Sequence, residues 1–407
     1  MDTKPFIKSL TISGFKSIRE LKELELNPLN ILIGSNGAGK SNFVSFFRML
    51  GEMVAGRLQM WTAEQGGAER VVFRGMKETS CVKGVLDFQT EEEEPWHEEC
   101  EECEHPCEMK LSNLGPIIDV YLFTLKAINA DNSFIISSER GGFYFEDVSW
   151  QEHGLFDENP LEQPSCGIYR ESFLQAEAAK GNDRAKYFYD SISSWKVYHF
   201  HDTTSTAGMK KFASVHDNAY LRPDASNLAA FLYRIQNESP EVYEQIRKTV
   251  RLAIPFFDDF VLRPETLKTE ERRVNLCWRQ LGSDYPYWPS QLSDGSLRFI
   301  CLVTALMQPD PPSTIVIDEP ELGLHPYAIT LLASLIKSAS KRMQVIVSTQ
   351  SVPLVNEFSI NDLIVVEREN DESVFHRYDE ADFQNWLEEY TVGELWQKNI
   401  LGGRPPK

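Results

Sequence analysis

Residues 34–41 read Gly34-Ser35-Asn36-Gly37-Ala38-Gly39-Lys40-Ser41, and this stretch decides the fold. A short, mostly apolar run at 29–33 precedes it, and residues 41–55 follow with the apolar spacing of a helix. Strand, glycine-rich loop and helix in this order form the context that a phosphate-binding P-loop requires. The sequence therefore predicts a nucleotide site near the start of the chain.

The residue types in this loop suit the phosphates of ATP. Its glycines permit backbone angles that point successive N–H groups at phosphate oxygens, and the following helix adds its positive N-terminal end. We expect Lys40 to reach the β- and γ-phosphates and Ser41 to offer a hydroxyl to Mg²⁺. The predicted ATP-binding residues of the loop are Asn36, Gly37, Gly39, Lys40 and Ser41.

A second pair of motifs lies towards the other end of the chain. Gln291-Leu292-Ser293-Asp294-Gly295-Ser296 is a polar loop, and residues 314–318 form a β-rich run that ends in Asp318-Glu319. A carboxylate at the end of such a strand, beside a P-loop, is the usual holder of Mg²⁺, so we assign Asp318 to the metal. Glu319 extends one residue further and can accept a proton from an attacking water.

The overall composition is that of an ordinary globular protein, with 407 residues, 42% hydrophobic and 25% charged. No apolar run is long enough for a membrane helix and the start has no apolar targeting core, so we expect a cytoplasmic protein without a membrane partner. The net charge of −20 argues against broad, nonspecific wrapping of nucleic acid. Ten glutamates fall within residues 91–108, however, so a basic groove elsewhere stays compatible with this charge.

The pattern of expected strands, helices and loops divides the chain into three parts. Residues 1–147 combine the P-loop with strand-like runs, including a hairpin expected at 133–147. Residues 148–256 are mainly helical after a loop at 148–167, and are predicted to form an insertion or lid. Residues 257–407 contain the second motif pair and alternate strands with helices, which indicates a parallel sheet with right-handed crossovers.

These motifs resemble those of ABC-type ATPases. Residues 292–296 are similar to their signature loop, and residues 318–326 (DEPELGLHP) to their Walker B motif and D-loop. The opening residues 13–18 (SGFKSI) resemble the start of SMC and RecF proteins. The whole chain resembles the short "predicted ATPase" branch of the SMC/RecF-like ABC-type ATPases, which are AAA-type P-loop ATPases; further similar stretches are 195–202, 221–232 and 386–405.

The resemblance implies an α/β fold: an ABC-type P-loop ATPase head with a parallel core sheet, an antiparallel β part and a helical insertion (lid) domain. In that case residues 1–147 and 257–407 are the two ATPase lobes. The resemblance also implies a homodimer that sandwiches ATP, in which Ser293 and Gly295 cap the γ-phosphate bound by the partner subunit. Glu319 would be catalytic. Gln350 occupies the switch position, where the family usually has His, and can hydrogen-bond but carries no charge, so turnover would be slow.

An acidic, Cys-rich insert at about 91–110 offers a separate metal set. His97, Cys100, Cys103 and Cys107 follow the spacing H-x2-C-x2-C-x3-C, and thiolates with imidazole suit tetrahedral Zn²⁺. Four ligands in so short a stretch are tight, and a disordered acidic loop with reduced thiols explains the sequence equally well. Both readings stay open. A separate pair of histidines, His199 and His201, could also ligate a metal, but we expect this pair to be structural.

The sequence leaves three functions open. The favoured one is an ATP-hydrolysing switch that acts on DNA or on a separately encoded, DNA-linked effector, in repair or anti-phage defence, as SMC/RecF relatives do. A self-sufficient metal-dependent nuclease would need a carboxylate cluster that the sequence lacks. An ABC transport ATPase subunit fits less well, because the SGFKSI opening is similar to SMC and RecF proteins.

Overall fold

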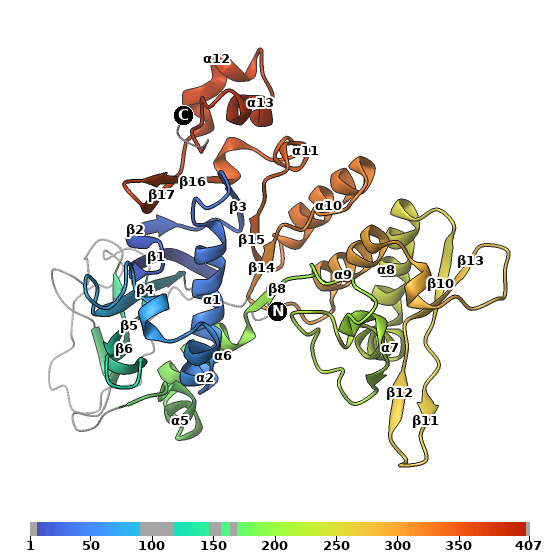
Figure 1. Cartoon of the computed structure of the whole chain (residues 1–407), viewed down its shortest axis with the longest axis horizontal. Coiled ribbons are helices and arrows are strands. Elements are labelled where there is room, and N and C mark those ends of the chain that lie inside the picture. The colour runs from blue at the N-terminus through green and yellow to red at the C-terminus, as the bar shows by residue number, and fades with distance from the viewer. Residues whose placement is uncertain (1–5, 90–116, 146–155, 163–168, 404–407) are drawn as a thin grey trace, which may run out of the picture. The chain divides into compact units, whose positions relative to one another are not determined.

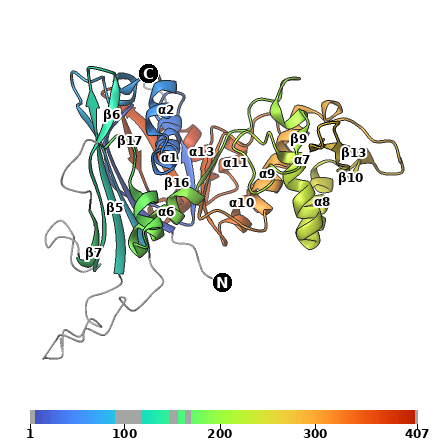
Figure 2. The same cartoon turned by 90° about the horizontal axis from the view of Figure 1, so that it is seen from below.

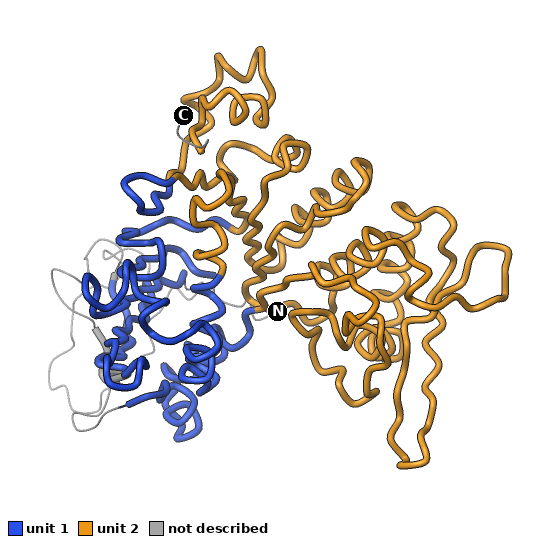
Figure 3. The backbone as a smooth tube through the Cα atoms, viewed as in Figure 1, with its two compact units in different colours: residues 1–27, 45–195, 368–375 blue, residues 28–44, 196–367, 376–407 orange. Residues whose placement is uncertain are grey.

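The computed structural model describes residues 6–89, 117–145, 156–162 and 169–403. The chain divides into two compact units, each assembled from segments that are distant in sequence (Figure 3). Unit 1 comprises residues 1–27, 45–195 and 368–375, and unit 2 comprises residues 28–44, 196–367 and 376–407. The helix that follows the P-loop therefore begins in unit 2 and continues in unit 1.

Unit 1 is built on an antiparallel sheet with the strand order β2-β1-β4-β5-β6-β7 (Figure 1). Its strands are β1 (Phe6–Phe15), β2 (Ile18–Glu25), β4 (Cys81–Gln89), β5 (Ile117–Ile128), β6 (Ser133–Phe145) and β7 (Phe156–Glu162). Its helices are α2 (Leu58–Glu64), α3 (Ala68–Val71), α5 (Leu174–Ala179) and α6 (Asp183–Ser194), together with most of α1 (Lys40–Val54).

Helix α1 lies beside this sheet (Figure 2), and aromatic side chains join the two. Phe46 of α1 lies edge-on to Phe15 of β1, with ring centroids 5.4 Å apart, and is stacked on Phe123 of β5 at 6.2 Å. All three rings are almost completely buried. The apolar face predicted for this helix is therefore its packing surface, and it fixes the end of the helix away from the P-loop.

Unit 2 contains a parallel sheet with the strand order β16-β3-β15-β14-β8. These strands are β3 (Leu29–Ile33), β8 (Lys196–Tyr198), β14 (Thr314–Asp318), β15 (Gln344–Ser348) and β16 (Leu363–Glu369), and β17 (Glu372–His376) follows β16 in the chain. Because the strands are parallel, their carboxyl ends meet at one edge of the sheet. This edge receives the P-loop from β3, Asp318 from β14, Gln350 after β15 and His199 after β8.

The remaining elements of unit 2 surround this sheet or extend from it. Its helices are α7 (Leu228–Glu238), α8 (Pro240–Ala253), α9 (Asp294–Met307), α10 (Pro326–Ala339), α11 (Val352–Val355), α12 (Gln384–Leu387) and α13 (Val392–Gln397). Short strands are β9 (Ala213–Ser214), β10 (Phe257–Val261), β11 (Glu265–Thr266), β12 (Arg272–Val274) and β13 (Cys277–Gln280). One hydrophobic cluster contains residues of α7, α8, α9, α10 and the parallel sheet.

The structure confirms the expected fold class but differs locally from the sequence predictions. Residues 133–145 form the single strand β6 and no hairpin, because the whole segment pairs with β5. The expected loop at 148–167 contains β7, which pairs with β6. The division at residues 147 and 256 stays a prediction. Within the described residues no helix is both long and apolar enough to cross a membrane.

Candidate nucleotide site

The P-loop joins a buried strand to a helix within unit 2. β3 is buried along its whole length, and α1 begins at Lys40. Gly37 has a φ of +79°, a backbone angle that is unfavourable for any residue with a side chain. A Cβ at Gly34 would lie 2.2 Å from the carbonyl oxygen of Val366, so close packing against β16 requires glycine there. Asn36, Gly37 and Ser41 are exposed at the loop surface, where a ligand can reach them.

Lys40 is held inside this loop. Its side chain is 5% exposed, and Nζ donates hydrogen bonds to the carbonyl oxygens of Gly34 at 2.7 Å and Ser35 at 3.1 Å. These bonds fold the lysine back over the loop. The ammonium group is thereby held within the loop, the segment that binds phosphate in P-loop proteins.

The charge on Lys40 is opposed by burial and favoured by carboxylates. Burial lowers its pKa, whereas Glu319, Asp318 and Glu321 act in the opposite direction. The carboxylates predicted from the second motif therefore lie within electrostatic range of the P-loop lysine. The two motifs, distant in sequence, form one site.

Asp318 ends β14 and is fixed by the neighbouring strand. Ser348, the last residue of β15, donates a hydrogen bond from its hydroxyl to Oδ1 of Asp318. The Asp318 side chain is 12% exposed. A carboxylate that is oriented in this way and still open to solvent is a suitable ligand for a divalent cation.

Glu319 and Gln350, the two predicted catalytic residues, contact each other. Gln350 donates from Nε2 to Oε1 of Glu319. Glu319 also has a φ of +45°, an unfavourable backbone angle for a residue other than glycine. Such strain commonly marks functional positions. Here it turns the chain sharply after β14.

Glu321 is a site residue that the sequence predictions did not assign. It is 8% exposed, and its Oε1 accepts hydrogen bonds from Thr349 Oγ1 at 2.6 Å and from the backbone N–H of Gln350 at 3.2 Å. Burial raises the pKa of its carboxyl group. The residue ties the loop after β14 to the loop after β15. The sequence feature that could have indicated Glu321 is its position three residues after Asp318.

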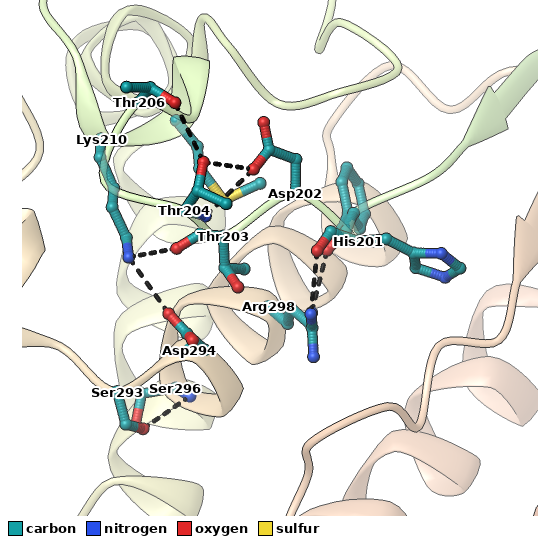
Figure 4. A network of polar contacts seen from close by, with 12 residues as sticks. His201, Asp202, Thr203, Thr204, Thr206, Lys210, Ser293, Asp294, Ser296 and Arg298 are labelled. Atoms are coloured by element: carbon teal, nitrogen blue, oxygen red, sulfur yellow. Dashed lines mark hydrogen bonds and ion pairs between the residues drawn. The ribbon is translucent and has the colours of Figure 1, made fainter.

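The signature loop caps its own helix. Ser293 is the N-cap of α9, and its Oγ accepts from the backbone N–H of Ser296 at 3.1 Å (Figure 4). A Cβ at Gly295 would lie 2.2 Å from the carbonyl oxygen of Gly323, so the first turn of α9 packs directly on the loop after β14. Ser293 and Asp294 are exposed. This arrangement presents a helix N-terminus and a hydroxyl at the surface.

Arg298 connects three segments of the site. Its guanidinium donates to the carbonyl oxygens of Phe200 at 3.0 Å, His201 at 2.9 Å and Leu322 at 2.8 Å. Figure 4 shows Arg298 on α9 pointing at His201. The signature helix is thereby linked to the segment after β8 and to the loop after β14. No motif in the sequence indicated this role.

Lys210 makes a second link to the same helix. Its Nζ donates to the carbonyl oxygen of Thr203 and to Oδ1 of Asp294, the latter at 3.1 Å (Figure 4). The segment after β8 is therefore held to α9 from both ends. Lys210 serves this intramolecular contact.

The predicted zinc ligands His97, Cys100, Cys103 and Cys107 lie outside the described residues. The zinc reading therefore stays a prediction.

Comparisons with known proteins bear on the family and the fold of this chain. The family described as "AAA domain, putative AbiEii toxin, Type IV TA system" matches residues 170–356, a little under half of the chain. A chromosome partition protein Smc from Desulfitobacterium hafniense (strain Y51) is 48% identical over 61 residues. That match spans 14% of this chain and only 5% of the Smc protein.

Two solved structures share the fold over most of the chain. An SMC head bound to the C-winged helix domain of ScpA matches with a TM-score of 0.57 at 14% identity, over 93% of this chain and 99% of that one. An Smc head domain with an extended coiled coil, bound to the C-terminal domain of ScpA and derived from Pyrococcus furiosus, gives 0.53 at 14% identity, over 95% and 99%. At 14% identity, the similarity to these two structures shows that the fold is shared, and nothing more.

The class follows from the fold and the motifs together. A P-loop and a strand-end acidic pair meet at the carboxyl edge of a parallel sheet, in a chain that folds like an SMC head. The chain resembles the SMC/RecF-like P-loop ATPases in its motifs and its fold, and the resemblance drawn from the sequence is confirmed.

Proposed function

We propose that this protein binds and hydrolyses ATP, dimerises around it, and acts as a switch on DNA or on a DNA-linked effector protein in repair or anti-phage defence. The observation that carries the proposal is the meeting of Lys40 with Asp318 and Glu319 at one sheet edge, where Gln350 contacts the predicted base.

Each residue has a distinct role in this proposal. The N–H groups of residues 36–41 and the ammonium of Lys40 bind the phosphates. Ser41 and Asp318 hold Mg²⁺, which would neutralise charge on the phosphates when bound. Glu319 accepts a proton from the attacking water, and Gln350 orients the Glu319 carboxylate. The exposed Ser41 and the partly exposed Asp318 suit a hydrated cation.

The proposed dimer is supported by the exposed residues of the signature loop. Ser293 and Asp294 lie at the N-terminus of α9, which carries partial positive charge and suits an anion. In the proposed dimer Ser293 and Gly295 of each subunit cap the γ-phosphate bound by the partner subunit. Hydrolysis would then require association, and the Arg298 contacts would transmit the state of this helix to the segment beside Asp318.

The fold and the charge distribution support an action on DNA or on an effector protein. It is supported by the SMC-head fold and by two solved heads that are bound to another protein, ScpA. Outside the acidic stretch 91–108 the chain is less negative, which leaves room for a local DNA contact. A separately encoded effector would explain why the sequence offers no second complete catalytic centre.

Zinc binding by the Cys-rich insert is a subordinate proposal. His97, Cys100, Cys103 and Cys107 provide four ligands of two types that zinc accepts, imidazole and thiolate. Metal analysis of the purified protein tests it. Near-stoichiometric zinc that is lost on Cys100→Ser with Cys103→Ser is expected, and its absence from metal-replete protein would reject the site.

The deciding experiment is a steady-state ATPase assay with and without double-stranded DNA, with Glu319→Gln as the blank. ATP turnover above the blank is expected, and stimulation by DNA would favour direct action on DNA. Turnover indifferent to DNA would favour a protein effector. Turnover no higher than that of Glu319→Gln would reject hydrolysis at this site, and plasmid cleavage by the protein alone would favour the nuclease alternative.

A further inference from the structure

The two strands beside β14 contribute different chemistry to Asp318. On one side β15 places Ser348 against Oδ1. On the other side β8 pairs in parallel with β14, with Tyr198 opposite Ile317. The next residues, His199 and Asp318, are therefore neighbours at the carboxyl edge, and His199 Nδ1 lies 3.8 Å from Oδ2 of Asp318.

The backbone around His199 is held in place. The N–H of His199 donates to the carbonyl oxygen of Pro223 at 3.0 Å. Its ring lies 3.8 Å, centroid to centroid, from the ring of His201. His201 in turn contacts the Asp318 carbonyl oxygen through Nε2 at 3.1 Å, and Arg298 binds the carbonyl oxygen of His201. The position of the His199 imidazole is thus fixed from several directions.

Packing alone does not account for this imidazole. The His199 side chain is 41% exposed, far more than a core residue of a parallel sheet, and it reaches solvent at the edge that carries the P-loop. An imidazole offers a donor and an acceptor in its neutral form and two donors when protonated. It can therefore contact a phosphate oxygen or a water bound to a cation.

On the β15 side of Asp318, the side chains of Gln350 and Ser348 are already engaged in hydrogen bonds. At the predicted switch position Gln350 uses its amide on Glu319, and Ser348 uses its hydroxyl on Asp318. Neither side chain can carry positive charge. The His199 imidazole, beside the Asp318 carboxylate, follows β8 and so lies on the far side of β14 from Gln350.

We propose that His199 is a further ATP-binding residue, which contacts the γ-phosphate end of ATP·Mg²⁺ from the β8 side of Asp318. This proposal rests on the proposed function, because it assigns His199 to the same nucleotide site. Its specific consequence is discrimination: His199 favours ATP over ADP, since only ATP offers the terminal phosphate. A histidine that merely packs or pairs with Asp318 would affect both nucleotides alike.

The test compares ATP and ADP affinity in the full chain carrying Glu319→Gln, which keeps ATP intact during titration. On this background His199→Ala is expected to weaken ATP·Mg²⁺ binding about tenfold or more, the range for one hydrogen bond to a charged group, and ADP·Mg²⁺ binding less than about twofold. His199→Gln, whose side-chain amide can lie near the Nε2 position, should restore part of the preference, because Nδ1 is buried against Asp318. His216→Ala removes an exposed histidine and is the matched control.

The outcomes separate the two proposals. If the Glu319→Gln parent binds neither nucleotide, the proposed function fails. If the parent binds ATP and His199→Ala leaves the ATP-to-ADP ratio unchanged, or weakens both equally, the role of His199 is overturned and the proposed function stands.

A second measurement covers the case in which His199→Ala does not fold. Imidazole NMR of the otherwise unchanged Glu319→Gln protein follows the His199 signal, identified by its loss in His199→Asn. The signal should shift on addition of ATP·Mg²⁺ and shift less with ADP·Mg²⁺. Equal shifts with both nucleotides, or none with either while ATP binds, would overturn the proposal.

Discussion

Gln350 donates a hydrogen bond from its amide nitrogen to the carboxylate of Glu319, across the loops that follow two adjacent strands. Glu319 is the proposed base and adopts a strained backbone angle of +45°. The contact therefore fixes the direction of the Glu319 carboxylate. Gln350, at the predicted switch position, thus contacts the proposed base itself.

Gln350→Ala removes this orienting contact. We expect kcat to fall about tenfold, the rate equivalent of one hydrogen bond, while the Kd for ATP changes less than about twofold. Phosphate release and nucleotide titration measure the two quantities. Gln245→Ala, at an exposed position of α8, is the control. A rate equal to that of the parent would show that Glu319 is oriented without Gln350.

Glu319→Gln removes the proposed base and leaves the nucleotide contacts in place. Turnover should fall by about 10²- to 10⁴-fold, the usual contribution of a general base. Because ATP then persists, an ATP-bound dimer should accumulate, detectable by light scattering after size exclusion. A variant that stays monomeric in saturating ATP would contradict the sandwich dimer.

Lys40→Ala should abolish ATP binding, because it removes the one buried ammonium that the described P-loop directs at the site. Isothermal titration with ATP·Mg²⁺ checks this. Lys341→Ala, at an exposed position after α10, should bind ATP like the parent. Retained micromolar affinity in a folded Lys40→Ala protein would reject the P-loop assignment.

Gly295→Ala should destabilise the protein, because the new methyl group would lie 2.2 Å from the carbonyl oxygen of Gly323. Overpacking of this kind costs about 1–3 kcal/mol. Gly51→Ala is the matched control, since a Cβ there meets nothing within 4 Å and lies inside α1. That change should stabilise the protein by about 0.5–1 kcal/mol. Denaturant unfolding of both variants gives the comparison, and equal stabilities would contradict the close approach.

A pH-dependent contribution to stability is expected from Glu139 in unit 1. This fully buried carboxyl accepts hydrogen bonds from Tyr121 and Ser172, each at 2.6 Å, but burial dominates and raises its pKa. A raised folded-state pKa means that the stabilisation is fully present below the unfolded value of 4.5 and is lost as pH rises through the folded value.

Glu139→Gln tests this dependence. The free energy of unfolding of the parent should decrease with pH above 4.5, by up to about 1.4 kcal/mol per pH unit from this one group, and the variant should lack that component. Glu64→Gln, which removes an exposed carboxylate of α2, is the control. Parallel pH curves for the parent and Glu139→Gln would refute the assignment.

The sequence alone determined the elements whose signal is local. Strand, glycine loop and helix at 29–55 and the apolar run that ends in Asp318 are written in consecutive residues, and the structure places β3, α1 and β14 there. The chemistry of Lys40 and Asp318 could be assigned because each residue type has a characteristic position relative to its strand. Local pattern misread residues 133–145, however, because pairing with β5 keeps that segment a single strand.

Only the tertiary structure decided which distant residues share the site. His199, Arg298 and Glu321 stand in stretches that look like ordinary strand ends and helix surface, and their roles come from contacts with Asp318, His201 and Gln350. The physical reason is that strand order within a sheet is set by packing over the whole domain. The residues after β8 lie beside Asp318 because β8 pairs with β14, and no short window of sequence contains that pairing.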